Sequence, residues 1–225
     1  MTWVKVCGMT NLEDALTAVE AGADAVGFVF YEKSPRNISV EAAREICSKL
    51  PESVEKVGVF VDADCDRIRD AVLGARLTAV QLHGKDSVDG VWKDLRPPIE
   101  CVGVAKLIPM IPGNALKDGG IYISDRVRES TFAVLIDTQV NGASGGTGLT
   151  FDWEGTREMA QSLGFFVPVI VAGGLTPLNV GDAIETFQPF GVDVASGVEA
   201  RPGKKDPEKV RAFVKAVRDA DRKAS

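Results

Sequence analysis

The chain has 225 residues, carries a formal net charge of −6 at pH 7 and is 45% hydrophobic. This length suits one large domain or two small ones, and the acidic balance argues against a nucleic-acid partner, because phosphate backbones bind basic surfaces. The longest apolar run, near residues 165–172, is too short to cross a bilayer, so we expect no membrane partner.

Short apolar segments alternate with helix-like stretches along almost the whole chain. The apolar segments are rich in Val, Ile, Leu and Phe and mostly lack alternation, as is typical of parallel strands buried on both faces. They predict strands over 3–7, 25–30, 56–61, 79–82, 101–108, 132–137, 167–172 and 192–195. The segments between them predict helices over 11–21, 40–50, 64–73, 87–95, 152–163, 177–187 and 206–222.

Several predicted helix ends carry residues that cap helices. Asn11 and Ser39 can each accept a hydrogen bond from the first turn of the helix that follows. Thr176 is followed by Pro177, which suggests a cap with a proline at the first helical position. Gly22 is suited to end the first helix.

Repeated β–α units favour an α/β fold, a single (β/α)8 TIM barrel over residues 1–225, with an open doubly wound sheet as the alternative. The stretch 109–130 contains prolines and glycines and is predicted to be irregular. We expect a loop, or at most a short helix, in place of the fifth barrel helix. No segment resembles a linker between domains.

Two residues that end predicted strands are candidates for chemistry, because barrel enzymes place catalytic groups at the carboxyl ends of strands. Cys7 ends the first strand, and Gly8 then lets the chain turn. A free cysteine can also be a small buried hydrophobic residue. Asp137 ends an apolar strand, where a carboxylate is costly to bury unless it is paired or used. Capping the following turn is its structural alternative.

Three further polar residues could contribute to a site. Asp193 lies within an apolar strand and could belong to the site or tie down the barrel rim. Arg36, in the turn after the second strand, has the planar fork that matches a carboxylate, although surface ion pairs are commoner. His83, at the end of the fourth strand, could act as acid or base or only as a hydrogen-bonding residue.

Three glycine-rich turns, at 145–148, 172–175 and 195–198, cluster in the last part of the chain. Glycine lets backbone N–H groups approach an anion, and barrels often bind phosphate near their seventh and eighth strands. The first half of the chain lacks such turns. The pattern therefore predicts one phosphate on the substrate rather than two.

The other cysteines, at positions 47, 65 and 101, are predicted to be structural. The four cysteines form no C-x-x-C pair, and with a single histidine a zinc site would lack ligands, so we expect no metal. No secretory apolar segment is present at the N-terminus. Reduced thiols and a cytoplasmic location are the expectation.

Eight segments also match the pattern of one known family in order. They are K-V-C-G-M at 5–9, G-F-V-F-Y-E-K-S-P-R at 27–36, V-G-V-F-V at 57–61, Q-L-H-G at 81–84, L-I-D-T at 135–138, G-G-T-G-L-T-F-D-W at 145–153, A-G-G-L-T-P-L-N-V at 172–180 and D-V-A-S-G-V-E at 193–199. Over nearly its whole length the chain resembles the phosphoribosylanthranilate isomerases of tryptophan biosynthesis.

The resemblance implies an Amadori rearrangement of N-(5'-phosphoribosyl)anthranilate to 1-(2-carboxyphenylamino)-1-deoxyribulose 5-phosphate, with no cofactor and no metal. It implies that Asp137 is the general acid that protonates the furanose ring oxygen. It also implies that Cys7 is the general base that removes the proton from C2′ of the ribose. Partial burial should raise the pKa of the acid, and the site must favour the thiolate or a concerted proton transfer.

The resemblance also implies roles in binding the phosphorylated small-molecule substrate. Arg36 is expected near the anthranilate carboxylate, Asp193 at an auxiliary polar position and His83 in a supporting role. The backbone expected to hold the phosphate belongs to Gly146, Gly148, Gly173, Gly174, Ser196 and Gly197. Ala195 stands where the family usually has serine. The sequence leaves open whether the protein is a monomer or a homodimer.

Two other functions are weighed against this one. The related histidine-pathway isomerase, or a bifunctional enzyme, would handle a substrate with two phosphates and is expected to use an aspartate in place of Cys7. A non-catalytic phosphate-binding barrel subunit would need neither Cys7 nor Asp137. Both alternatives fit the sequence less well.

Overall fold

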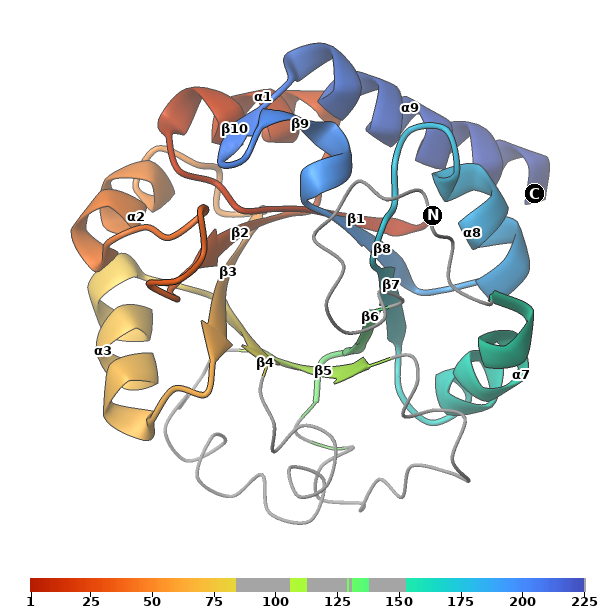
Figure 1. Cartoon of the computed structure of the whole chain (residues 1–225), viewed down its shortest axis with the longest axis horizontal. Coiled ribbons are helices and arrows are strands. Elements are labelled where there is room, and N and C mark those ends of the chain that lie inside the picture. The colour runs from red at the N-terminus through yellow and green to blue at the C-terminus, as the bar shows by residue number, and fades with distance from the viewer. Residues whose placement is uncertain (84–105, 113–128, 130, 138–152, 225) are drawn as a thin grey trace.

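The computed structural model describes residues 1–83, 106–112, 129, 131–137 and 153–224. Eight parallel strands close a barrel, and helices lie outside the ring (Figure 1). The strands are β1 (Trp3–Cys7), β2 (Ala25–Val29), β3 (Glu55–Val61), β4 (Ala79–His83), β5 (Lys106–Pro112), β6 (Val134–Asp137), β7 (Val169–Ala172) and β8 (Gly191–Val194). The predicted barrel is confirmed, and because β8 pairs with β1, the open sheet is excluded.

The described helices follow their strands around the ring. They are α1 (Leu12–Ala21), α2 (Val40–Cys47), α3 (Cys65–Ala75), α7 (Trp153–Gly164), α8 (Val180–Phe187) and α9 (Pro207–Ala224). After β8 the chain forms the 3-10 helix η2 (Ser196–Val198) and a two-stranded hairpin of β9 (Glu199–Arg201) and β10 (Lys204–Lys205). Helix α9 packs against both α1 and α8 and fills the place between them in the outer layer (Figure 1). No helix among the described residues could span a membrane.

Strand alternation divides β1 between two environments. Val4 and Val6 are fully buried in the core cluster between the strands and the helices. Trp3, at the start of β1, packs in one cluster inside the barrel, and Cys7, at the carboxyl end of β1, packs in another beside Val29. Because alternate residues of a strand share a face, Lys5, between Trp3 and Cys7, also points into the barrel.

Local capping explains where the first helices begin and end. The Asn11 side chain accepts a hydrogen bond from the backbone N–H of Asp14, and the Ser39 side chain accepts one from Ala42. Gly22 ends α1 in the left-handed conformation. These three predicted boundaries are confirmed.

The predicted start of the helix over 177–187 is wrong. Helix α8 begins at Val180, and Asn179 is its cap residue. The Asn179 side chain instead accepts from the backbone N–H of Thr176 and donates to the carbonyl of Gly174. These bonds, with the Thr176 hydroxyl accepting from the N–H of Leu178, hold a turn in the place of the first helical turn.

The boundary between the predicted fifth strand and the irregular stretch is also wrong. Pro109 and Pro112 lie in β5, where they pair with Leu82 and Asp137. Each proline lacks the N–H that would donate in the strand ladder, and β5 continues through Pro109 without that hydrogen bond. The predicted helix over 87–95 lies outside the described residues, and most of 113–130 lies outside them too.

The expectation of reduced thiols holds for two cysteines and fails for a third. Cys7 and Cys47 are free and buried, whereas Cys65, the first residue of α3, is disulfide-bonded. Spacing along the chain does not show which thiols the fold brings together, so the sequence prediction had no signal for this bond.

Candidate active site

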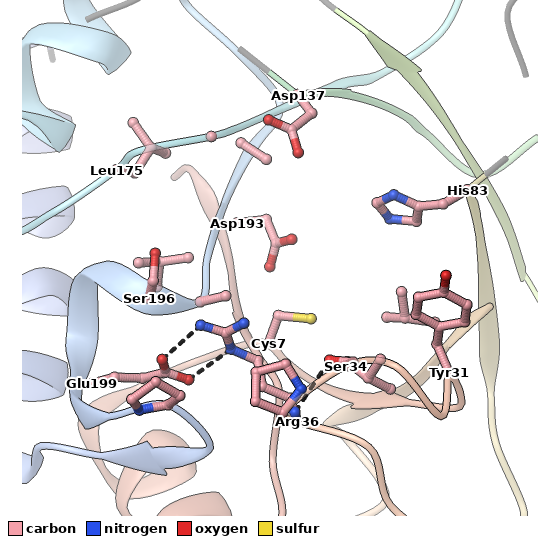
Figure 2. Close-up of a pocket in the computed structure, with 18 of the residues that line it drawn as sticks. Cys7, Tyr31, Ser34, Arg36, His83, Asp137, Leu175, Asp193, Ser196 and Glu199 are labelled. Carbon is pink, nitrogen blue, oxygen red and sulfur yellow. Dashed lines mark hydrogen bonds and ion pairs between the residues drawn. The ribbon is translucent and has the colours of Figure 1, made fainter. Parts of the chain in front are cut away.

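A pocket of about 690 Å³ opens at the carboxyl ends of the strands. Its lining comes from β1, β2, β3, β4, β6, β7 and β8, and from the segments that follow several of them. Cys7, Asp193 and Asp137 point into it from three strands, with His83 across from them (Figure 2). This volume is typical of a small-molecule site.

Cys7 is held at the base of this pocket by the turn that follows β1. The backbone N–H groups of Gly8 and Met9 both donate to the carbonyl of Gly27 on β2. Gly8 adopts a φ of +85°, and a Cβ there would lie 2.6 Å from Cδ of Arg36. The turn therefore requires glycine, and it brings the Arg36 side chain over the end of β1.

Opposing effects determine the pKa of the Cys7 thiol. Its residue is 7% exposed, and burial raises the pKa of the thiol. Asp193 adds to this rise, whereas the positive charges of Lys5 and Lys205 oppose it. The net pKa lies above its ordinary value, so the free enzyme holds Cys7 mainly as a thiol at neutral pH.

Asp193 is paired rather than solvated. It stands opposite Lys5 in the register of β8 and β1, and Nζ of Lys5 donates to its Oδ1 at 2.9 Å. The Lys5 side chain is fully buried, and that of Asp193 is 8% exposed. Burial would by itself lower the pKa of Lys5, but Asp193 and Cys7 outweigh it and raise that pKa.

Arg36 makes a two-point contact with Glu199 of β9. Its Nε and Nη2 donate to the two carboxylate oxygens at 2.8 and 2.7 Å (Figure 2). Nζ of Lys205 also donates to Glu199, at 3.1 Å. The hydrogen bonds to Glu199 raise the pKa of Arg36, and the two cations outweigh burial to lower the pKa of Glu199. Arg36 also lines the pocket, so the outer edge of its guanidinium, which Glu199 does not occupy, can contact a ligand there.

His83 ends β4 and faces the pocket in its neutral form. Nε2 of its ring lies 2.6 Å from Nε2 of Gln81, so in this amide orientation the ring nitrogen accepts and the ring proton is on Nδ1. Burial, with the charge of Lys5, lowers the pKa of His83 to about 4. A neutral imidazole can donate one hydrogen bond to a ligand. The supporting role of His83 stays a prediction.

Asp137 ends β6 in the position that the sequence predicts. It stands between Pro112 of β5 and Ala172 of β7 in the strand register. Its side chain is partly buried and lines the same pocket as Cys7. The structure thus brings the two predicted catalytic residues to one cavity from strands 130 positions apart in the sequence.

The predicted phosphate-binding residues divide into three groups. Gly173, Gly174 and Ser196 line the pocket, and both glycines have positive φ angles, 92° and 65°. Gly197 does not belong to the lining; a Cβ there would lie 1.8 Å from the carbonyl oxygen of Leu175, so this glycine permits close packing. Two further predicted residues, Gly146 and Gly148, lie outside the described residues.

Three charged residues of the site were not predicted from the sequence. Glu199 and Lys205 come from the hairpin after β8, which carries no local signal of a site. Lys5 had a signal, since a lysine within an apolar strand, two residues before Cys7, must share the face of that cysteine. Across the part of the chain that the structure describes, no three His, Cys, Asp or Glu side chains are arranged to hold a metal ion.

Known proteins match this chain over nearly its full length. The family model described as N-(5'-phosphoribosyl)anthranilate (PRA) isomerase matches residues 4–216. A protein of Geotalea uraniireducens named N-(5'-phosphoribosyl)anthranilate isomerase is 46% identical over 219 residues, which cover 97% of this chain and 99% of that relative. A protein of Thermotoga neapolitana with the same name is 45% identical over 222 residues, with 97% and 99% covered.

Solved structures agree in fold. The phosphoribosyl anthranilate isomerase of Thermotoga maritima superimposes with a TM-score of 0.79 at 40% identity, covering 97% of this chain and all of that one. A second structure, of an isomerase in complex with reduced 1-(o-carboxyphenylamino)-1-deoxyribulose 5-phosphate, has a TM-score of 0.77 at 39% identity, with 97% and 100% covered.

Proposed function

The chain belongs to the N-(5'-phosphoribosyl)anthranilate isomerase family of tryptophan biosynthesis, and we propose that Cys7 and Asp137 are its general base and general acid. The enzyme is an aldose–ketose isomerase, as predicted from the sequence. The observation that carries the proposal is that a thiol and a carboxyl from β1 and β6 line one pocket, beside a guanidinium held at its rim.

The first proposed step opens the sugar. A protonated Asp137 donates its proton to the furanose ring oxygen while the bond from that oxygen to C1′ breaks. The nitrogen lone pair of the anthranilate forms the C1′=N bond, which gives a protonated Schiff base. The ring oxygen becomes a hydroxyl, and the carboxylate of Asp137 remains.

The second proposed step moves a proton from carbon. The Cys7 thiolate removes the proton from C2′, and the electron pair forms a C1′=C2′ bond as the C1′=N electrons return to nitrogen. The resulting enolamine tautomerises to the ketone. One proton is given and one is taken, and no electrons leave the substrate, so the reaction requires no redox cofactor.

The substrate would be held at its two ends. The outer edge of the Arg36 guanidinium can take the anthranilate carboxylate, because its inner edge already binds Glu199. The segments at Gly173–Gly174 and Ser196 can take the phosphate through backbone N–H groups at the mouth of the pocket. Asp193 lies centrally in the pocket and His83 lies across from it (Figure 2), and both would contact the sugar.

The test follows the loss of phosphoribosylanthranilate fluorescence as substrate is consumed. Cys7→Ser and Asp137→Asn should each lower kcat by about 10²-fold or more, in the range removed with a general acid or base. Cys47→Ser is the matched control, since that buried free thiol lies on α2 away from the pocket. Wild-type turnover in either pocket variant would show that the assigned acid–base pair is wrong.

A structural relative from Thermotoga maritima is described as a dimeric isomerase from which monomers were generated, so relatives occur in both forms. For this chain we keep the prediction of a monomer or homodimer, which sedimentation would decide. A cytoplasmic location likewise stays a prediction.

A further inference from the structure

Lys5 is a fully buried cation that the acid–base assignment does not use. It lies two residues before Cys7 on the inward face of β1, and its side chain has no exposed surface. Burying a lysine is unfavourable unless a partner compensates its charge. Its ion pair with Asp193 supplies that compensation. Two apolar side chains of similar volume would fill the same space without any charge to compensate.

The arrangement of β1 and β2 brings the end of the Lys5 side chain close to the thiol of Cys7. Gly27 stands opposite Cys7 in the register of β1 and β2. The position where a Cβ of Gly27 would lie is 2.7 Å from Sγ of Cys7 and 3.2 Å from Cε of Lys5. The absence of a side chain at Gly27 therefore opens one small space, and both the thiol and the end of the lysine enter it.

The other charged groups near the thiol of Cys7 have a smaller effect on its ionisation than Lys5 has. Lys205 and Arg36 both donate to Glu199, which offsets their charges. His83 and Asp137 line the same pocket from β4 and β6, and His83 is neutral. Lys5 opposes the rise in the pKa of the thiol more than Lys205 does, while Asp193 works in the other direction.

We propose that Lys5 is a positioning residue for catalysis, which stabilises the thiolate form of Cys7 while Asp193 holds the ammonium in place. The proposal rests on the proposed function, in which Cys7 is the base. Lys5 does not touch the substrate in this scheme. It makes available the anion that removes the proton from C2′.

The experiment measures the reactivity of Cys7 without substrate. The rate of carbamidomethylation by iodoacetamide is followed against pH, and the Cys7 peptide is quantified by mass spectrometry to separate it from Cys47. Because Lys5→Met alone leaves Asp193 buried without its partner and could fail to fold, the informative pair is Asp193→Asn and the double variant Lys5→Met/Asp193→Asn. Circular dichroism checks that both are folded.

The two substitutions should shift the pH dependence of Cys7 alkylation in opposite directions. Asp193→Asn removes a nearby negative charge, so the alkylation profile should move to lower pH than in the wild type. Adding Lys5→Met should move it back to higher pH by at least one unit, which is about a tenfold lower rate at pH 7. Lys56→Met is the control, because Lys56 is also buried but donates to the carbonyl of Pro51. Superimposed profiles for the single and double variants would overturn the proposal.

Turnover separates this proposal from the assignment of Cys7 as base. In the pH profile of kcat, the acidic limb of the double variant should lie at higher pH than that of Asp193→Asn. The variant Asp193→Asn/Lys5→Arg, which keeps a cation at position 5, should reverse most of this shift. If Cys7→Ser keeps wild-type turnover, the base assignment fails, and with it the catalytic role of Lys5. If Cys7→Ser is inactive but the alkylation profiles coincide, only the role of Lys5 fails.

Discussion

Arg36 and Glu199 meet edge to edge, with Nε and Nη2 of the guanidinium donating to the two carboxylate oxygens at 2.8 and 2.7 Å. The two residues are 163 positions apart in the chain and join the loop after β2 to β9. Because one edge of the fork is occupied by the protein, the guanidinium has a defined orientation before substrate arrives. A rigid cation of this kind binds a carboxylate with little loss of side-chain entropy.

Replacing Glu199 by Gln should therefore weaken substrate binding more than catalysis. An amide can accept from one guanidinium nitrogen, but its NH₂ group faces the other, so the orientation of Arg36 is lost. We expect KM to rise about tenfold, or roughly 1.4 kcal/mol, with a smaller change in kcat. Glu208→Gln, which breaks an exposed pair with Arg211, is the control. Steady-state kinetics decide, and an unchanged KM would contradict the positioning role.

Gly27→Ala should impair turnover while the barrel stays folded. The new Cβ would lie 2.7 Å from Sγ of Cys7 and 3.2 Å from Cα of the same residue, so the thiol must move. We expect kcat to fall at least tenfold and the free energy of unfolding to fall by about 1–3 kcal/mol.

The control for this substitution is Gly181→Ala in α8. A Cβ at Gly181 meets nothing within 4 Å, and alanine in a helix is favoured over glycine by about 0.5–1 kcal/mol. That variant should be slightly more stable and fully active. Thermal unfolding and turnover are measured on both variants, and full activity of Gly27→Ala would show that the thiol tolerates displacement.

His83 should titrate far below an ordinary histidine. It is the single histidine of the chain, so one proton NMR titration reports on it without assignment. Its pKa is lowered to about 4, and protonation would remove the acceptor that faces Gln81. A midpoint near 6.5 would mean that the ring is solvated and unpaired.

The same shift has a consequence for stability. Below about pH 6.5 the unfolded chain binds a proton at His83 that the folded protein does not, so folding becomes less favourable as the pH falls. The loss should develop between about pH 6.5 and 4 and reach about 2–3 kcal/mol. Urea unfolding of the wild type and His83→Gln over this range would isolate it, since the variant should lack this component.

Sequence patterns located the strands well because parallel barrel strands are buried on both faces and appear as continuous apolar runs. Strand ends also predicted that Cys7 and Asp137 reach one pocket, since the carboxyl ends of barrel strands meet at the same face. The fifth strand extends further along the chain than the sequence predicts, because Pro109 does not end it. A proline signals only a missing donor, and whether that donor is needed depends on the neighbouring strand.

The charged residues that form pairs in the site were harder to predict, because the two members of a pair lie far apart in the sequence. Glu199 is recognisable as part of the site only when the hairpin folds back over the barrel. Lys5 is different: its position two residues before Cys7 places it on the inward face, and no structure is needed to see this.

The pair formed by Lys5 and Asp193 also joins the first strand of the barrel to the last, across 188 residues. During synthesis, β1 leaves the ribosome long before β8 exists, and until then its lysine has no Asp193 to meet. The electrostatic setting of the thiol is therefore completed by the same event that closes the ring. A chain truncated between β7 and β8 would retain Cys7 and Asp137 yet lack Asp193, so isomerase activity reports on whether the last strand has closed the barrel.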